Sequence, residues 1–225
     1  MALVDLHREG GVFVLTMQAG ENRFNRPFLE ALHAALDEVE RSSGPAALVT
    51  TGGSEKFYSN GLDLAWLSGD GQSEGGAFIS AVLRLFGRVL VYPLPTVAAI
   101  NGHAFAAGAM LALAHDYRVM RADRGFFCLP EVDIKLPLAP GMTALIKNRL
   151  SQATFRDAIL TGARIGGSDA ATRGIVDEAV PGADVLAHAI ARAAALAEKD
   201  RQIYGTLKRG MYGDVLAILE HGSLA

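Results

Sequence analysis

The sequence predicts an α/β fold with mainly parallel strand pairing. Short β-type runs alternate with segments whose apolar residues have helical spacing, an alternation typical of parallel sheets covered by helices. Half of the residues are hydrophobic (50%) and only 20% are charged. A chain of 225 residues with this composition can bury one substantial core. We expect residues 1–180 to form the α/β core and residues 181–225 to form a helical C-terminal layer.

The elements can be assigned in chain order. Two β-type runs, residues 3–6 and 12–17, flank Gly10-Gly11 and predict an opening hairpin. Residues 46–50 have the pattern of a buried strand that ends before Gly52-Gly53. The helices expected from apolar spacing cover residues 27–39, 77–90, 106–114, 142–150, 154–160 and 185–197. The other strands are expected at residues 96–100, 117–120 and 175–180, and Gly-rich surface loops at 68–76 and 162–167.

Charge composition excludes one class of partner. The chain has 21 Lys and Arg against 24 Asp and Glu, a net charge of −3, and contains no basic run. Binding to nucleic acids or to anionic membranes needs clustered Lys and Arg, so neither partner is expected.

Cysteine usage and targeting patterns predict a cytoplasmic protein. The single cysteine, Cys128, excludes an intramolecular disulfide and a cysteine-rich zinc site, which fits a reducing compartment. The N-terminal residues lack the pattern of a secretory signal. The apolar stretch 89–100 is broken by Pro93 and Pro95, and residues 222–225 do not match a peroxisomal address.

Three segments rich in small residues are candidates for chemistry. They are Lys56-Phe-Tyr-Ser-Asn-Gly-Leu-Asp63, Asn101-Gly-His-Ala-Phe-Ala-Ala-Gly108 and Phe126-Phe-Cys-Leu-Pro-Glu131. The second follows a predicted strand and opens a helix, so free N–H groups and the positive end of a helix dipole should lie there. Such a helix start can stabilise an anion, although small residues at this place are also common packing devices. The phosphate-loop and dinucleotide-binding patterns are absent.

In this order and spacing, the three segments resemble those of the crotonase family, the enoyl-CoA hydratases and isomerases. The similarity continues through Leu160–Ile165 and Gly174–Glu178 and covers most of the chain. Within the family, Ser59–Ala65 and Ala114–Tyr117 are most similar to plant-type Δ3,Δ2-enoyl-CoA isomerases. The resemblance implies a crotonase-like (ClpP/crotonase) spiral of ββα units with a helical C-terminal region. It also implies a role in fatty acid metabolism and assembly into a homotrimer or hexamer through the C-terminal helices.

The resemblance further implies an oxyanion hole and a base. By position, the backbone N–H groups of Leu62 and Ala107 would hold the thioester carbonyl of an acyl-CoA, and Glu131 would be the base. Ala107 stands where the family usually has glycine, and an alanine restricts φ there. The other residues that the resemblance places around the substrate are Ser59, Asn60, Gly61, Asp63, Trp66, Phe105, Gly108, Met110 and Pro130. No metal and no cofactor are implied, because coenzyme A is part of the substrate.

Met110 bears on which reaction is expected. Hydratases of the family usually have a glutamate at this place and a second one in the Pro-Glu segment, whereas this chain has only Glu131. One carboxylate can take a proton from C2 and return it at C4, so the sequence favours isomerisation of a 3-enoyl-CoA to a 2-enoyl-CoA. Two alternatives are hydration or another crotonase-family reaction, and binding of a CoA thioester without turnover.

The neighbours of Glu131 in the sequence also indicate a role for it, independently of the resemblance. Its apolar neighbours should raise the pKa of its carboxyl toward the range of a useful base. A surface glutamate after a proline turn is the competing interpretation. We expect the nearby Asp133 and Lys135 to point elsewhere or to pair with each other.

Overall fold

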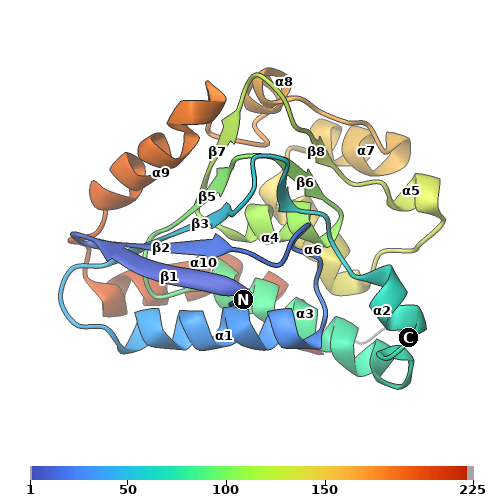
Figure 1. Ribbon diagram of the computed structural model, residues 1–225, viewed down its shortest axis with the longest axis horizontal. Helices are drawn as coiled ribbons and strands as arrows, with labels where there is room; N and C mark the ends of the chain where they lie inside the picture. The colour runs from blue at the N-terminus through green and yellow to red at the C-terminus, as the bar shows by residue number, and fades with distance from the viewer. Residues whose placement is uncertain (1, 222–225) are drawn as a thin grey trace.

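Six strands form a mixed sheet at the centre of the computed structural model, which describes residues 2–221 (Figure 1). In spatial order they are β1 (Val4–Glu9), β2 (Val12–Met17), β3 (Ala47–Gly52), β5 (Thr96–Ile100), β7 (Tyr117–Arg121) and β9 (Glu178–Val180). β1 and β2 form the antiparallel hairpin expected from the sequence, and every other neighbouring pair is parallel. The α/β prediction is confirmed.

Side-chain alternation along the strands separates two apolar layers. On β2, Val12 and Val14 belong to the cluster on one face, which α9 (Val185–Ala194) covers. Phe13, Leu15 and Met17 belong to a larger core on the other face of the sheet, away from α9. The helices of that larger core include α1 (Arg26–Arg41), α3 (Gly75–Leu90), α4 (Ala107–Ala114), α6 (Pro140–Arg149) and α10 (Arg201–His221). Both faces of the sheet are therefore buried, as parallel sheets require.

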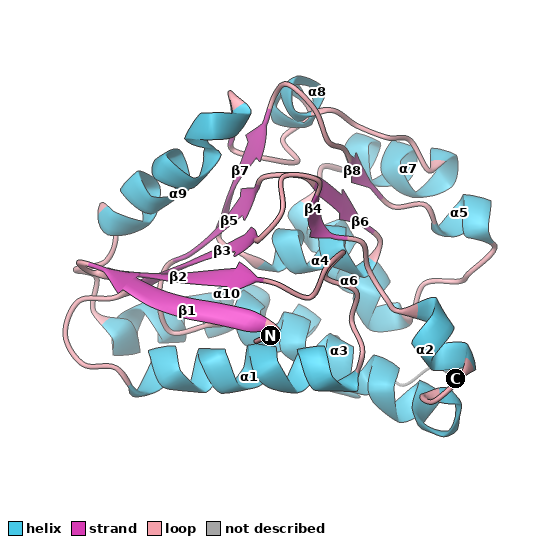
Figure 2. Cartoon of the chain, viewed as in Figure 1, coloured by secondary structure: helices cyan, strands magenta, loops and turns pink. Residues whose placement is uncertain are grey.

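A second sheet of three short parallel strands stands beside the first (Figure 2). Its strands are β4 (Phe57–Ser59), β6 (His103–Phe105) and β8 (Phe127–Cys128), in that order. None of them was expected, because strands of two or three residues are too short to show a hydrophobic period. Each one lies inside one of the three candidate segments.

α4 is the innermost helix. All eight of its residues, Ala107–Ala114, are buried, and a helix that is apolar on every side belongs in an interior. Its small side chains let it pack closely against the second sheet. An added methyl group at Gly108 would lie 2.3 Å from the carbonyl oxygen of Ser59 on β4. The first turn of α4 and β4 are therefore in direct backbone contact.

Three expectations from the sequence need correction. The strand expected at residues 175–180 is only β9, because the N–H groups of Ile175 and Val176 bond to Ala170 at the end of a helix. The loop expected at 68–76 is largely helical, and the one expected at 162–167 contains a bridge from Ile165 to β8. The helices not assigned from the sequence are α2 (Leu64–Ser68), the 3₁₀ turns at Gln72–Glu74 and Gly182–Asp184, α5 (Glu131–Ile134), α8 (Gly167–Thr172) and α10. α7 (Gln152–Thr161) was expected.

The C-terminal helix α10 packs on α3 and α6. A buried ion pair fixes it to the sheet, because Lys208 Nζ lies 2.8 Å from Asp116 Oδ1. The hydroxyl of Tyr204 also donates to Asp116, at 3.1 Å. The C-terminal address considered from the sequence, residues 222–225, lies outside the described residues. Within the described part of the chain, no helix combines the length and the apolar character needed to cross a bilayer.

Candidate active site

The second sheet brings the three candidate segments together. Asn60–Asp63 follows β4, Ala106 and Ala107 follow β6, and Leu129–Glu131 follows β8. The three strands are parallel, so the segments that follow them meet at one edge of the sheet. The carboxyl edge of a parallel sheet is a common place for ligand binding.

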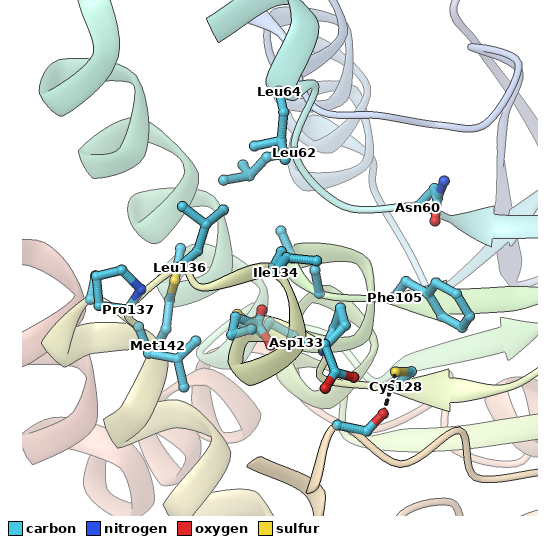
Figure 3. A pocket seen from close by; sticks show the side chains of 18 of the residues that line it. Asn60, Leu62, Leu64, Phe105, Cys128, Asp133, Ile134, Leu136, Pro137 and Met142 are labelled. Carbon is cyan, nitrogen blue, oxygen red and sulfur yellow. Dashed lines mark hydrogen bonds between the residues drawn. The ribbon is translucent and has the colours of Figure 1, made fainter. Parts of the chain in front are cut away.

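A cavity of about 530 Å³ opens at this edge. Leu136, Pro137 and Met142 gather at one end of it, and Asn60 and Phe105 lie at the other (Figure 3). The first end is lined by aliphatic side chains from the segment between α5 and α6 and from α6 itself. The cavity therefore offers an apolar compartment next to the polar groups at the sheet edge.

Two backbone N–H groups in the cavity wall have no partner. Within the described residues, no hydrogen bond uses the N–H of Leu62 or that of Ala107, and both residues line the cavity. The two segments touch at Gly61, where an added methyl group would lie 3.3 Å from the backbone nitrogen of Ala107. Two free donors on adjacent segments form the kind of site that stabilises an oxyanion.

The neighbouring chain explains why the N–H of Leu62 is free. Phe24 forms a bridge with this loop: its N–H donates to the carbonyl of Gly61 at 2.8 Å, and its carbonyl accepts from the N–H of Asp63 at 2.9 Å. This pairing uses the carbonyl of Gly61 and the N–H of Asp63 and leaves the N–H of Leu62 unbonded. The carboxylate of Asp63 then caps α2 by accepting from the N–H of Trp66 at 3.0 Å.

At the second donor, the backbone restriction falls on Ala106 and not on Ala107. Ala107 is the first residue of α4, whereas Ala106 has φ 50° and ψ −123°, in the region that favours glycine. The expectation that an alanine at 107 restricts the site is therefore corrected. The unusual backbone at Ala106 turns the chain from β6 into α4 and exposes the first N–H groups of the helix.

Glu131 is the first residue of α5 and lines the cavity. Its Oε2 is buried and has no hydrogen-bond partner among the described residues. Burial raises the pKa of this carboxyl above its ordinary value, while its own backbone N–H lowers it by less. A carboxylate that is desolvated and unpaired is a stronger base than one in water.

Asp133 and Cys128 also line the cavity. No ion pair joins Asp133 to Lys135 within the described residues, which corrects the expectation that Asp133 pairs or points elsewhere. Burial raises the pKa of the Cys128 thiol to about 11, and its Sγ donates to the carbonyl of Gly162 at 3.2 Å (Figure 3). This thiol is not activated as a nucleophile. Across residues 2–221, no three His, Cys, Asp or Glu side chains are grouped so that they could hold a metal ion.

A family model described as enoyl-CoA hydratase/isomerase matches residues 7–221. The chain belongs to this family. The resemblance inferred from the three segments is therefore confirmed, and so is the crotonase fold.

Curated relatives in the family carry both reaction names. Enoyl-CoA delta isomerase 2, peroxisomal, of Arabidopsis thaliana is 33% identical over 95% of this chain and 94% of its own length. A probable enoyl-CoA hydratase of Rhodobacter capsulatus is 34% identical over 90% of this chain and 78% of its own length. Among solved structures, a probable enoyl-CoA hydratase of Mycobacterium tuberculosis has a TM-score of 0.90 at 27% identity, covering 98% of this chain and 92% of its own.

Seven of the twelve residues assigned to the site from the sequence line the cavity of this family member. They are Asn60, Leu62, Phe105, Ala107, Met110, Pro130 and Glu131. Each of the three segments contributes at least two of them. Met110 is 1% exposed and forms part of the wall near the start of α4.

The other five residues do not line the cavity, and they pack behind the segments that do. Ser59 is buried and donates from Oγ to the carbonyl of Asn22 at 2.7 Å, and Gly108 packs against it. Asp63 is used as the cap of α2, and Gly61 provides the close approach between the two donor segments. The Trp66 ring packs edge-on against Phe78, with 4.8 Å between ring centroids.

The apolar end of the cavity was not assigned residue by residue from the sequence. Its lining comes from α2, α3, α5, α6 and the segment between α5 and α6: Leu64, Leu67, Ile79, Ile134, Leu136, Pro137, Leu138, Ala139 and Met142. The one signal in the sequence was the run Leu136-Pro-Leu-Ala-Pro-Gly141, which departs from the Gly-rich stretch of hydratases and indicated a differently shaped acyl pocket.

Replacing Ala106 by glycine tests the backbone geometry at the second donor. A non-glycine residue in this region costs about 1–3 kcal/mol, and glycine adopts it freely at a smaller entropic cost. We expect Ala106→Gly to raise the free energy of unfolding by about 1 kcal/mol in denaturant titrations. Ala109→Gly, inside α4, should lower it by about 1 kcal/mol or more. Equal destabilisation by the two variants would contradict the assigned backbone of Ala106.

Proposed function

We propose that this chain is an acyl-CoA isomerase that moves the double bond of a 3-enoyl-CoA to position 2. The observation that carries the proposal is the meeting of one unpaired buried carboxylate, on Glu131, with two unbonded N–H donors in one cavity wall. The thioester carbonyl accepts from the N–H groups of Leu62 and Ala107. These donors stabilise the negative charge that develops on the oxygen as the dienolate forms.

Glu131 carries the proton in this proposal. Its carboxylate takes a proton from C2, where the carbonyl and the 3,4 double bond both acidify the carbon, and the electron pair moves into the dienolate. The same group, now protonated, returns the proton to C4, and the conjugated 2-enoyl thioester forms. No second acid or base is needed, which agrees with the apolar Met110 in the wall.

One observation favours a second candidate, hydration or another reaction of the family. Asp133 lies two residues after Glu131 and lines the same cavity, so a second carboxylate reaches the site. In hydration, Asp133 would activate water while Glu131 delivers a proton to carbon. Loss of the conjugated chromophore from a 2-enoyl-CoA, abolished in Asp133→Asn, would support it. The position of Glu131 in the cavity wall favours either reaction over binding without turnover.

A Glu131→Gln variant tests the assignment of the base. The amide keeps the shape of the side chain and cannot accept the C2 proton. We expect the rate of conjugation of a 3-enoyl-CoA, followed by absorbance, to fall about 10²- to 10⁴-fold, with substrate affinity little changed. Asp133→Asn is the matched control on the same helix and should keep most of the activity. Unchanged activity in Glu131→Gln would place the base elsewhere.

The pH dependence of activity should report the ionisation of Glu131. The base must be charged, and burial disfavours the charged form, so activity falls as pH decreases through a pKa above the ordinary 4.5 of a glutamate. We expect kcat/KM, measured from about pH 4 to about pH 8, to rise with a midpoint above 4.5. A midpoint at or below 4.5 would contradict a desolvated base.

We also propose that the chain forms a homotrimer or hexamer through α10. Ile203, Leu207 and Met211 are 58%, 61% and 65% exposed and recur every four residues, so they form one apolar stripe on the helix. The opposite side of α10 is already used against α3 and α6. The cytoplasmic location expected from the sequence stays a prediction, and the word peroxisomal in the name of the plant relative describes that protein.

Charge placed in this stripe should break the assembly. We expect Leu207→Glu to shift the sedimentation coefficient toward that of a monomer, because a carboxylate would be buried without a partner. Gln202→Glu adds the same charge to another exposed side of α10 and should leave the assembly intact. A monomeric wild-type protein would contradict the proposal.

A further inference from the structure

The two donors of the oxyanion hole belong to separate segments of the chain. Leu62 lies in the loop after β4, and Ala107 begins α4. An anion held by two donors is stabilised only if both lie at hydrogen-bond distance from the same oxygen. The spacing between β4 and α4 therefore matters to the reaction as well as to the fold.

A buried chain of hydrogen bonds joins these two elements through β3. The hydroxyl groups of Tyr58, on β4, and Thr50, on β3, are 2.8 Å apart. Thr50 Oγ1 is 3.0 Å from Nε2 of His115, the residue that ends α4. Nδ1 of His115 is 2.8 Å from the carbonyl of Leu111 in the last turn of α4. Tyr58 and His115 are fully buried and Thr50 is 5% exposed.

Only one arrangement of protons satisfies this chain of hydrogen bonds. Burial lowers the pKa of His115 to about 3, and the neighbouring cations Lys208, Arg118 and Arg149 add to this effect, so the ring is neutral and carries one proton. The carbonyl of Leu111 only accepts, so the proton is on Nδ1 and Nε2 accepts from Thr50. Thr50 must then accept from Tyr58, whose hydroxyl stays protonated because burial raises its pKa.

Both ends of this chain of hydrogen bonds are held by further hydrogen bonds, to Asn22 at one end and to Arg118 and Arg149 at the other. The backbone carbonyl of Tyr58 accepts from Nδ2 of Asn22 at 2.9 Å, and the next residue, Ser59, donates to the carbonyl of the same Asn22. At the other end, the carbonyl of His115 accepts from Arg118 and from Arg149, each at 2.9 Å. Neither Tyr58 nor His115 can therefore shift alone.

We propose that Tyr58, Thr50 and His115 are positioning residues that fix the spacing between the N–H groups of Leu62 and Ala107. None of the three lines the cavity, so they act through the backbone of β4 and α4. The inference rests on the proposed oxyanion hole and extends it to the residues that set its geometry.

Two variants break the chain of hydrogen bonds, and two matched variants remove equally buried hydroxyl groups elsewhere. Tyr58→Phe and Thr50→Val break the connection. Thr51→Val is the neighbour on β3, whose hydroxyl donates to Ala99 and not to the chain. Tyr92→Phe removes a phenol that lies just after α3 and donates to the carbonyl of Leu36 on α1 at 2.7 Å. Thr50→Ser keeps the hydroxyl and is the conservative rescue.

Three quantities are measured for each variant: kcat, KM for a 3-enoyl-CoA, and the enolate absorbance of bound acetoacetyl-CoA. The last one reports stabilisation of an oxyanion directly and does not depend on turnover. We expect Tyr58→Phe and Thr50→Val to lower kcat by about 10- to 100-fold with KM little changed, and to lower the enolate fraction. Thr51→Val, Tyr92→Phe and Thr50→Ser should keep both close to the wild-type values.

The outcomes separate this inference from the proposed function. If the wild-type protein forms the enolate and the two chain variants match their controls, the positioning role is wrong and the proposed function stands. If the two chain variants and the two matched controls lose activity alike, the hydrogen bonds of Tyr58, Thr50 and His115 are no more than structural contacts. That result also overturns the inference. If the wild-type protein neither isomerises a 3-enoyl-CoA nor ionises acetoacetyl-CoA, the proposed function fails and the inference falls with it.

Discussion

The parallel pairing of three very short strands is the constraint on which the site depends. β4, β6 and β8 pair in parallel, with Phe57 opposite His103 and Phe105 opposite Cys128, and the register of β4 on β6 shifts between Phe57 and Ser59. Because the strands run in the same direction, the donors after β4 and β6 and the carboxylate after β8 meet at one edge. A shift of one strand by a residue would reverse the faces of its side chains and separate the groups. The chemistry therefore follows from backbone pairing before any side chain is considered.

Close backbone approach is what allows this pairing. An added methyl group would lie 2.5 Å from the carbonyl of Lys56 at Gly102 and 2.1 Å from the carbonyl of Phe57 at Gly52. Both distances are shorter than real contacts, so glycine is required where the two sheets and α4 converge. The chain of hydrogen bonds from Tyr58 through Thr50 to His115 pairs polar side chains buried in the same region, whereas Nδ1 of His103 and Oε2 of Glu131 have no partner among the described residues. An unpaired Oε2 on Glu131 is expected of a group that must accept a proton from substrate.

The sequence predicted most elements with a clear hydrophobic period and missed the shortest ones, while α10, of 21 residues, was expected only as part of a helical C-terminal layer. The opening hairpin, the strand Thr96–Ile100 and the helix ending at Leu90 all have patterns long enough to recognise, and the structure confirms them. The second sheet could not be predicted by period, because its strands have two or three residues. Its position was nevertheless marked by the order of three degenerate segments, which is why the family and the fold were identified while the sheet was not.

The same distinction holds for the residues that line the cavity: those in the three segments were predicted, and those at the apolar end were not. Residues at the sheet edge, such as Leu62 and Glu131, were assigned because they belong to the segments, and they line the cavity. The apolar end depends on how α5 and α6 fold back over the edge, which only tertiary packing decides. Asp133 is an example, since it was expected to point elsewhere or to pair with Lys135, whereas it lines the cavity.

A single carboxylate that both removes and returns the proton is the central claim, and isotope transfer tests it most directly. The measurement is mass spectrometry of the product formed in one turnover from a 3-enoyl-CoA carrying deuterium at C2. The account predicts a 2-enoyl product with no added oxygen and with part of the C2 deuterium transferred to C4. A product heavier by one water, or an isomerised product with no deuterium at C4 in a single turnover, would contradict it.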